Sequence, residues 1–289
     1  VANEIKKLNK YLEGFDCKIE SNIPSGAGIS SSAALECGLA IGLNELFNLN
    51  IDKIDIAKIC RNAEHNFVGA KCGIMDQFSV IFGTKNKLLF LNCKTLKSRL
   101  VNAVFEPYSI ILLNTNVSHN LAESEYNSRR NDCNKLLNIV NSKGFRFNDI
   151  CEIPMDLLRS LKNEFDIKLF EKAEYVILEN KRTISAAKHI ENNDLKRFGR
   201  LMYESHEGLR KKYKVSCKEL DFLVDLFKND CDVIGSRMMG GGFGGSTINL
   251  VKRDYVKSFI DIAKKEYCNK FNIKLTSIST SISNGVEVL

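Results

Sequence analysis

The chain has 289 residues, 44% of them hydrophobic, which is enough to bury the core of one large domain or two ordinary ones. Its formal net charge is +7, but Lys and Arg are interspersed with Asp and Glu, and tryptophan is absent. This pattern indicates solvated charged faces and disfavours a nucleic-acid-binding surface. No apolar stretch approaches a membrane span or resembles a secretory signal, so we expect a cytoplasmic protein with no membrane partner.

The ten cysteines are scattered singly along the chain. They form no CxxC pair, and no histidine lies near them at the spacing of metal ligands. We therefore expect reduced thiols that pack as small apolar side chains, and no disulfide framework.

The first part of the chain is predicted to combine short strands, glycine-containing loops and helices. Residues 15–23 alternate in character and end at a proline, which predicts a strand that runs into a glycine-rich loop. Apolar residues then recur at helical spacing from Ser31 onward, with serines as caps at the helix start. A second helix is expected at 54–67, followed by an apolar stretch at 75–82. Strands are expected at 87–91 and 108–114.

The remainder is predicted to be helix-rich and to close with strands. Helical patterns occupy 121–140, 157–162, 170–190, 195–212 and 220–227. Strands are expected at 232–237, 246–251 and 274–281, with a helix at 254–267. Because the composition turns helical near residue 115, we expect an α+β protein with two domains, residues 1–115 and 116–289.

The segment PSGAGISSS, residues 24–32, combines small residues with hydroxyl groups at a predicted helix start. Glycines let a ligand approach the backbone N–H groups closely, and the positive end of the helix dipole favours anions. A serine hydroxyl can also ligate Mg²⁺ beside phosphate oxygens. The pattern predicts a phosphate site formed by Gly26, Ala27, Gly28, Ile29, Ser30, Ser31 and Ser32. A plain glycine turn capped by serine is the structural alternative.

Two segments resemble a known kinase family. The first, PSGAGISSSAAL, resembles the phosphate-binding motif of the GHMP kinase superfamily. The second, residues 63–78 with the sequence AEHNFVGAKCGIMDQF, is similar to the corresponding segment of galactokinases. This resemblance implies that Glu64 binds Mg²⁺, that Asp76 faces the sugar hydroxyl as the catalytic base, and that the backbone near Cys72 and Gly73 helps to define the sugar pocket. Taken alone, Glu64 could be a helix-surface charge and Asp76 a helix cap.

Phosphoryl transfer needs two separated carboxylates of this kind. A metal neutralises the β- and γ-phosphate oxygens, and a carboxylate orients the attacking hydroxyl and receives its proton. Ser32 and Glu64 suit the first task, and Asp76 suits the second.

Two later segments extend the resemblance. Residues 119–133, HNLAESEYNSRRNDC, resemble the galactokinase segment whose tyrosine contacts the sugar, which points to Tyr126; a half-buried helix tyrosine is the structural alternative. Residues 235–250, GSRMMGGGFGGSTINL, resemble the C-terminal glycine-rich motif of the same kinases. They also satisfy GxGxxG, but we reject a dinucleotide site because a strand rather than a helix is expected to follow.

The resemblance covers the chain from about residue 20 to its end. Galactokinases carry an N-terminal signature with an arginine that assists phosphoryl transfer and with acidic residues and a histidine that hold galactose, and the chain contains no such segment. We therefore expect a GHMP kinase fold whose first domain is truncated, with a helix-rich C-terminal domain and the site between the two domains.

The function implied by the resemblance is transfer of the ATP γ-phosphate to the anomeric hydroxyl of galactose, with Mg²⁺. The sequence does not give the oligomeric state, and we favour a monomer. Two alternatives stay open. One is a kinase for another hexose, such as N-acetylgalactosamine, because the residues that grip the sugar are largely absent. The other is a non-catalytic sensor of galactose and ATP. Retention of both Asp76 and residues 30–32 argues against the sensor, because a sensor could lose the base without harm.

Overall fold

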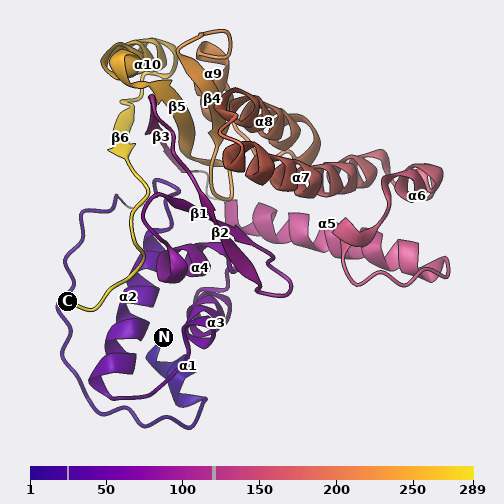
Figure 1. The fold of residues 1–289 in the computed structure, drawn as a ribbon. Coiled ribbons are helices and arrows are strands. Elements are labelled where there is room, and N and C mark those ends of the chain that lie inside the picture. The colour runs from indigo at the N-terminus through magenta and orange to yellow at the C-terminus, as the bar shows by residue number, and fades with distance from the viewer. Residues whose placement is uncertain (25, 119–121) are drawn as a thin grey trace. The chain divides into compact units, whose positions relative to one another are not determined.

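The computed structural model describes residues 1–24, 26–118 and 122–289, and the side chains of all of these except 118 and 122–126. The chain forms two compact units (Figure 1). Unit 1 contains Val1–Val104 and Ser281–Leu289, and unit 2 contains Phe105–Thr280. The division expected near residue 115 falls inside strand β3 (Tyr108–Ser118), which belongs wholly to unit 2.

Unit 1 is built on three helices that pack against one another: α2 (Ser31–Leu46), α3 (Lys53–Ala63) and α4 (Met75–Phe82). A short helix, α1 (Ala2–Lys6), packs on α3. Beside the helices, β1 (Lys87–Leu91) and β2 (Ser98–Asn102) form an antiparallel pair. The core of the unit contains fully buried side chains from all three main helices, among them Cys37, Leu43, Ile56, Cys60 and Phe78.

The strand predicted at residues 15–23 is wrong. Residues 10–24 form neither helix nor strand. A strand must satisfy its backbone N–H and C=O groups with a neighbouring strand, and no segment in the described part of unit 1 pairs with this one. The segment instead runs beside α2, where the ring of Phe15 lies 6.4 Å from that of Phe47.

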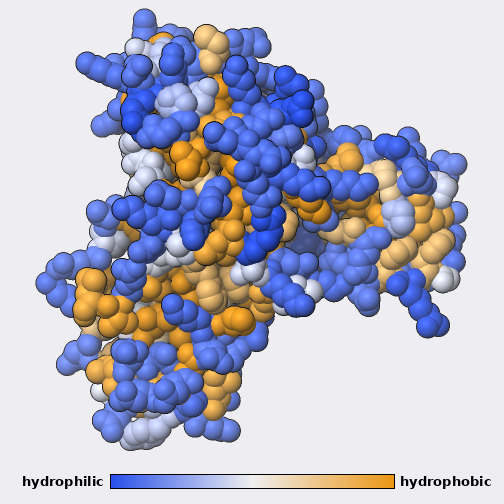
Figure 2. Space-filling model, viewed as in Figure 1, coloured by the Kyte–Doolittle hydropathy of each residue, from blue (hydrophilic) through white to orange (hydrophobic). Residues whose placement is uncertain are grey.

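The sequence of α2 is apolar on almost every side, which is typical of a helix that packs on more than one face. One face packs against α3 and α4, and another lines an open pocket of about 590 Å³ whose other wall is formed by residues 15–21 and Ile23. Leu35 and Leu46 remain about half exposed there, at 48% and 63%. Apolar side chains accordingly gather on the visible face of unit 1 (Figure 2).

The C-terminal segment of the chain holds the end of α4. The Gly285 N–H donates to the Gly83 carbonyl at 2.9 Å, and the Val286 N–H donates to the Val80 carbonyl at 2.7 Å. A Cβ atom on Gly285 would lie 2.4 Å from the Val80 oxygen, so only glycine allows this approach. The contact fixes the helix whose first turn carries Asp76.

Unit 2 contains a four-stranded antiparallel sheet in the order β4-β5-β3-β6. Its other strands are β4 (Val233–Met238), β5 (Gly244–Lys252) and β6 (Thr276–Thr280). Two helices, α9 (Lys218–Leu226) and α10 (Val256–Phe271), share a core with the sheet that includes Ile111, Leu223 and Phe259. The remaining helices are α5 (Ala122–Ser142), α6 (Met155–Ser160), α7 (Ile167–Glu191) and α8 (Leu195–Gly208).

Helix α8 packs beside α7 and along β4 (Figure 1). Its Gly199 lies so close to the strand that a Cβ atom would be 2.0 Å from the Ile234 oxygen. The mixture of helices and strands confirms the predicted α+β class. Among the described helices, none combines the length and the apolar composition that crossing a membrane requires.

Candidate functional site

The predicted phosphate loop leads directly into α2. Gly26 and Gly28 have φ angles of +72° and +69°, a region in which glycine is strongly favoured, and Ser30, the N-cap, has φ +59°. The Ser30 side chain makes no capping hydrogen bond, and the first turn of α2 contains no acidic residue. The helix start therefore offers its positive dipole end to an anion without competition from a side-chain cap.

Glu64 begins a π-helical turn (Glu64–Val68) that continues α3. The turn ends at Gly69, which has φ +88° and donates its N–H to the Glu64 carbonyl at 2.9 Å. The Glu64 residue is only 8% exposed, so the alternative of a helix-surface charge is wrong. π-Helical turns inside helical segments are frequent at functional sites, because they redirect a side chain away from its α-helical position.

Asp76 lies in the first turn of α4. The N-cap of this helix is Ile74, so Asp76 is not the cap residue, although its charge is favourable near the helix N-terminus. The connection between the two acidic residues is fixed by the His65 ring, whose Nε2 lies 2.8 Å from the Cys72 carbonyl oxygen.

The predicted residues of unit 1 lie close enough together to influence one another electrostatically. The pKa of the Cys72 thiol is raised by burial, and also by the negative charges of Glu64, Asp76 and Glu36. Cys72 is half-buried and the neighbouring Gly73 is exposed. The structure thus brings Glu64, Cys72 and Asp76 together in one acidic region of unit 1.

Two residues of this region were missed in the sequence. Glu36 lies one helical turn after Ser32 on α2, and burial together with the nearby Glu64 raises the pKa of Glu36 to about 7. Gln77 follows Asp76, is 2% exposed, and hydrogen-bonds to Glu36 through its side chain. The sequence could have indicated Glu36, because its spacing of four residues from Ser32 places both side chains on one face of the predicted helix.

The donor set of this region fits a hard divalent cation. Within the described part of the chain, no Lys or Arg forms an ion pair with Glu36, Glu64 or Asp76. Carboxylate and hydroxyl oxygens are the ligands that Mg²⁺ prefers, and Ser32 and Glu64 supply both kinds. A buried carboxylate without a cationic partner is costly, and a bound cation would remove that cost.

The structure describes only part of the predicted site in unit 2. Tyr126 belongs to α5, but its side chain lies outside the described residues. The glycine-rich segment forms the loop between β4 and β5, where the Phe243 N–H donates to the Val215 carbonyl at 2.8 Å. A Cβ atom on Gly242 would lie 2.1 Å from the same oxygen. Strand β5 follows the loop, so the rejection of a dinucleotide motif is confirmed.

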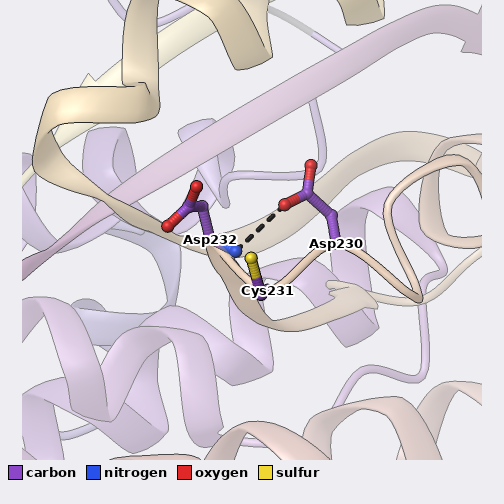
Figure 3. A group of neighbouring side chains, drawn as sticks. All are labelled: Asp230, Cys231 and Asp232. Atoms are coloured by element: carbon purple, nitrogen blue, oxygen red, sulfur yellow. Dashed lines mark hydrogen bonds between the residues drawn. The ribbon is translucent and has the colours of Figure 1, made fainter.

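A second group of possible metal ligands lies in unit 2, just before β4: Asp230, Cys231 and Asp232 (Figure 3). The Asp230 carboxylate accepts a hydrogen bond from the Asp232 N–H at 2.9 Å. Asp232 also pairs with Lys252 at 3.3 Å. Since these carboxylates already have partners that build a turn, we assign no metal to them.

Comparisons with known proteins identify the family. The model of the GHMP kinases N terminal domain matches residues 1–84, and that of the GHMP kinases C terminal domain matches residues 185–269. A galactokinase from Thermosipho africanus is 40% identical over 99% of this chain and 79% of that protein. A galactokinase from Clostridium beijerinckii is 41% identical over 95% of this chain and 70% of that protein.

A comparison with solved structures also indicates a galactokinase. The galactokinase of Lactococcus lactis, crystallised with galactose, matches 98% of this chain and 73% of its own with a TM-score of 0.90 and 29% identity. The mevalonate kinase of Methanococcus jannaschii, with a TM-score of 0.57 and 21% identity, shares the fold. Both the predicted GHMP kinase fold and the predicted resemblance are confirmed, and the chain belongs to the galactokinase family of the GHMP kinases.

Proposed function

We propose that the protein transfers the γ-phosphate of ATP to the anomeric hydroxyl of galactose and releases ADP and α-D-galactose 1-phosphate. The hydroxyl oxygen forms a bond to the γ-phosphorus, while the bond from that phosphorus to the oxygen bridging to the β-phosphate breaks. The observation that carries the proposal is the cluster of carboxylates in unit 1 without Lys or Arg partners among the described residues, next to a helix start that suits phosphate.

The phosphates are assigned to the loop from Gly26 to Ser32. Its backbone N–H groups and the dipole of α2 favour the phosphate oxygens. Ser32 and Glu64 would hold Mg²⁺, which when bound neutralises charge on the β- and γ-phosphates. The burial of Glu64 supports this role, because a buried carboxylate gains more from a cation than an exposed one.

Asp76 is assigned as the base. Its carboxylate accepts the proton of the anomeric hydroxyl as that oxygen attacks, and later passes the proton to solvent. Its position in the first turn of α4, and the His65–Cys72 contact in the connection from Glu64, support this role. Tyr126 and the backbone near Cys72 and Gly73 are proposed to contact the sugar.

A panel of sugars tests the substrate. Galactose, N-acetylgalactosamine and glucose are offered with Mg-ATP to the protein expressed from its complete gene, and released ADP and the phosphorylated sugar are measured. The proposal expects turnover with galactose and a product phosphorylated at the anomeric position. Turnover with only another sugar would overturn the galactose assignment, and galactose binding without ADP release would favour a sensor.

Three finer points of the proposal stay predictions. Mg²⁺ as the metal is tested by replacing it with Ca²⁺, which prefers longer bonds and more ligands and should support little turnover. The monomeric state is tested by light scattering of the purified protein. The cytoplasmic location is tested by fractionation of cells.

A further inference from the structure

Glu36 is an acidic side chain on the predominantly apolar helix α2. It lies one turn after Ser32 on α2, so the two side chains lie on the same face of the helix. Its Oε2 atom is buried and has no hydrogen-bond partner among the described residues. The residue as a whole is partly buried, and an apolar side chain would leave no unpaired oxygen there.

The surroundings of Glu36 connect the cation side of the proposed site with the base side. Glu64 is near enough to disfavour the charge on Glu36, and the Gln77 side chain hydrogen-bonds to Glu36. Gln77 is 2% exposed, and its own Oε1 atom has no partner in the described part of the chain. Its backbone carbonyl lies 3.8 Å from the Cys37 sulfur, which holds α2 against α4.

This arrangement is costly unless something positive lies beside it. Two neighbouring carboxylates repel each other, and burial weakens the solvent screening of that repulsion. No described Lys or Arg forms an ion pair with either of them, in contrast to most buried acidic residues. A divalent cation would convert the repulsion into attraction for both carboxylates at once.

We propose that Glu36 is a second carboxylate of the divalent-cation site. It does not ligate the cation as Glu64 and Ser32 do, but its negative charge increases the affinity of the site for the cation. Gln77 positions it by hydrogen bonding and couples it to the first turn of α4. Glu36 is thus a positioning residue, because it acts through Glu64 rather than on the substrate. The inference rests on the proposed function for the identity of the cation site, but its test does not need turnover.

The test measures Mn²⁺ binding by electron paramagnetic resonance in the presence of ADP. The variant is Glu36→Gln, which keeps the shape and removes the charge. The matched control is Glu45→Gln, which removes the same charge from an exposed position on the same helix. The proposal expects Glu36→Gln to weaken Mn²⁺ binding by roughly 10- to 100-fold, as for other groups behind a metal ligand, and Glu45→Gln to leave it unchanged.

A conservative variant separates the charge from the packing. Glu36→Asp keeps the carboxylate and should retain much of the Mn²⁺ affinity that Glu36→Gln loses. Unchanged Mn²⁺ affinity in Glu36→Gln would overturn the inference, as would undetectable Mn²⁺ binding by the unmodified protein. If galactose-dependent turnover is absent but Mn²⁺ affinity depends on Glu36, the proposed function fails and the inference on the cation site stands.

Discussion

Two groups of partly or fully buried carboxylates, one in each unit, differ in how their charge is balanced. In unit 2, Glu179 accepts a hydrogen bond from Ser205 at 2.5 Å and pairs with Arg182 and Arg237. Asp221 lies 3.2 Å from His206 Nε2 and 3.1 Å from Arg210 Nε, and accepts a hydrogen bond from Ser216 at 2.6 Å. In unit 1, the carboxylates of Glu36, Glu64 and Asp76 have no such partners among the described Lys and Arg residues.

This difference distinguishes carboxylates that stabilise the fold from carboxylates that bind a ligand. A buried acidic group that serves the fold is neutralised by its neighbours, since an unpaired one lowers stability. A protein keeps an unpaired group where a ligand will supply the partner, and strongly perturbed carboxylates are for that reason concentrated at active sites. Substitutions in the paired carboxylate group of unit 2 should therefore lower stability, and substitutions in the unpaired carboxylate group of unit 1 should lower activity.

The largest effect is expected at Asp76. Asp76→Asn should lower galactose-dependent turnover by roughly 100- to 10,000-fold, the contribution of a positioned base, while the unfolding midpoint stays nearly constant. ADP release and thermal unfolding measure the two quantities. Asp55→Asn, at an exposed carboxylate of α3, is the control and should leave turnover unchanged. A turnover loss equal in both variants would contradict the role of Asp76.

The opposite pattern is expected at Asp221. Asp221→Ala removes the hydrogen-bond acceptor of Ser216 and the negative charge beside His206 and Arg210, and should lower the free energy of unfolding by about 2 to 3 kcal/mol at neutral pH. Chemical denaturation measures this value. The control Asp225→Ala removes an exposed neighbour on α9 that pairs with Arg210, and should cost less than about 1 kcal/mol.

The pH dependence of the Asp221 effect has a definite sign. Burial alone would raise the pKa of Asp221, but His206, Ser216 and Arg210 lower it below its ordinary value of 3.8. The stabilisation is therefore present above pH 3.8 and is lost as the pH falls through the folded-state pKa. A destabilisation by Asp221→Ala that grows on acidification would contradict this account.

A smaller loss is expected where the C-terminal segment contacts α4. Gly285→Ala brings a Cβ atom against the Val80 carbonyl and should lower the free energy of unfolding by about 1 to 3 kcal/mol. Because α4 carries Asp76, turnover should fall as well. Gly14→Ala is the control, since no atom lies within 4 Å of its added Cβ. Equal stability of the two variants would exclude the contact as a constraint.

The smallest effect concerns the pH dependence of stability at Glu36. Its pKa is raised from 4.5 to about 7 in the folded chain, so the unfolded chain loses this proton at lower pH. Folding stability should therefore decrease as the pH rises from about 4.5 to 7. Glu36→Gln should remove this slope and stabilise the metal-free protein more at pH 8 than at pH 5, as unfolding midpoints at the two values would reveal.

Most of the helices and strands could be predicted from the hydrophobic periodicity of the sequence. The helices α7 and α10 and the strands β4 and β5 were predicted because their apolar positions face a core. The strand at 15–23 failed because alternation shows which face could be buried but not whether a partner strand exists. The return of the last residues to unit 1 was also missed, since contacts distant in sequence leave no local pattern.

The candidate site was predicted unevenly for a similar reason. The loop before α2, Glu64 and Asp76 lie in contiguous motifs that a single sequence displays. Glu36 and Gln77 join the same region only because α2 packs on α4, and their unpaired buried atoms become visible only with side chains in place. The burial of Glu64 likewise required the structure, because a single glutamate on a helix is usually exposed.

The most direct test of the contrast between the units is the Mg²⁺ dependence of galactose-dependent ADP release in Glu64→Gln, with the metal-free unfolding midpoint measured beside it. If the unpaired carboxylates of unit 1 form the cation site, the variant needs at least roughly 10-fold more Mg²⁺ for half-maximal turnover and unfolds at the same or a higher temperature. An unchanged Mg²⁺ requirement together with a lower unfolding temperature would show that Glu64 serves the fold, and would contradict the account.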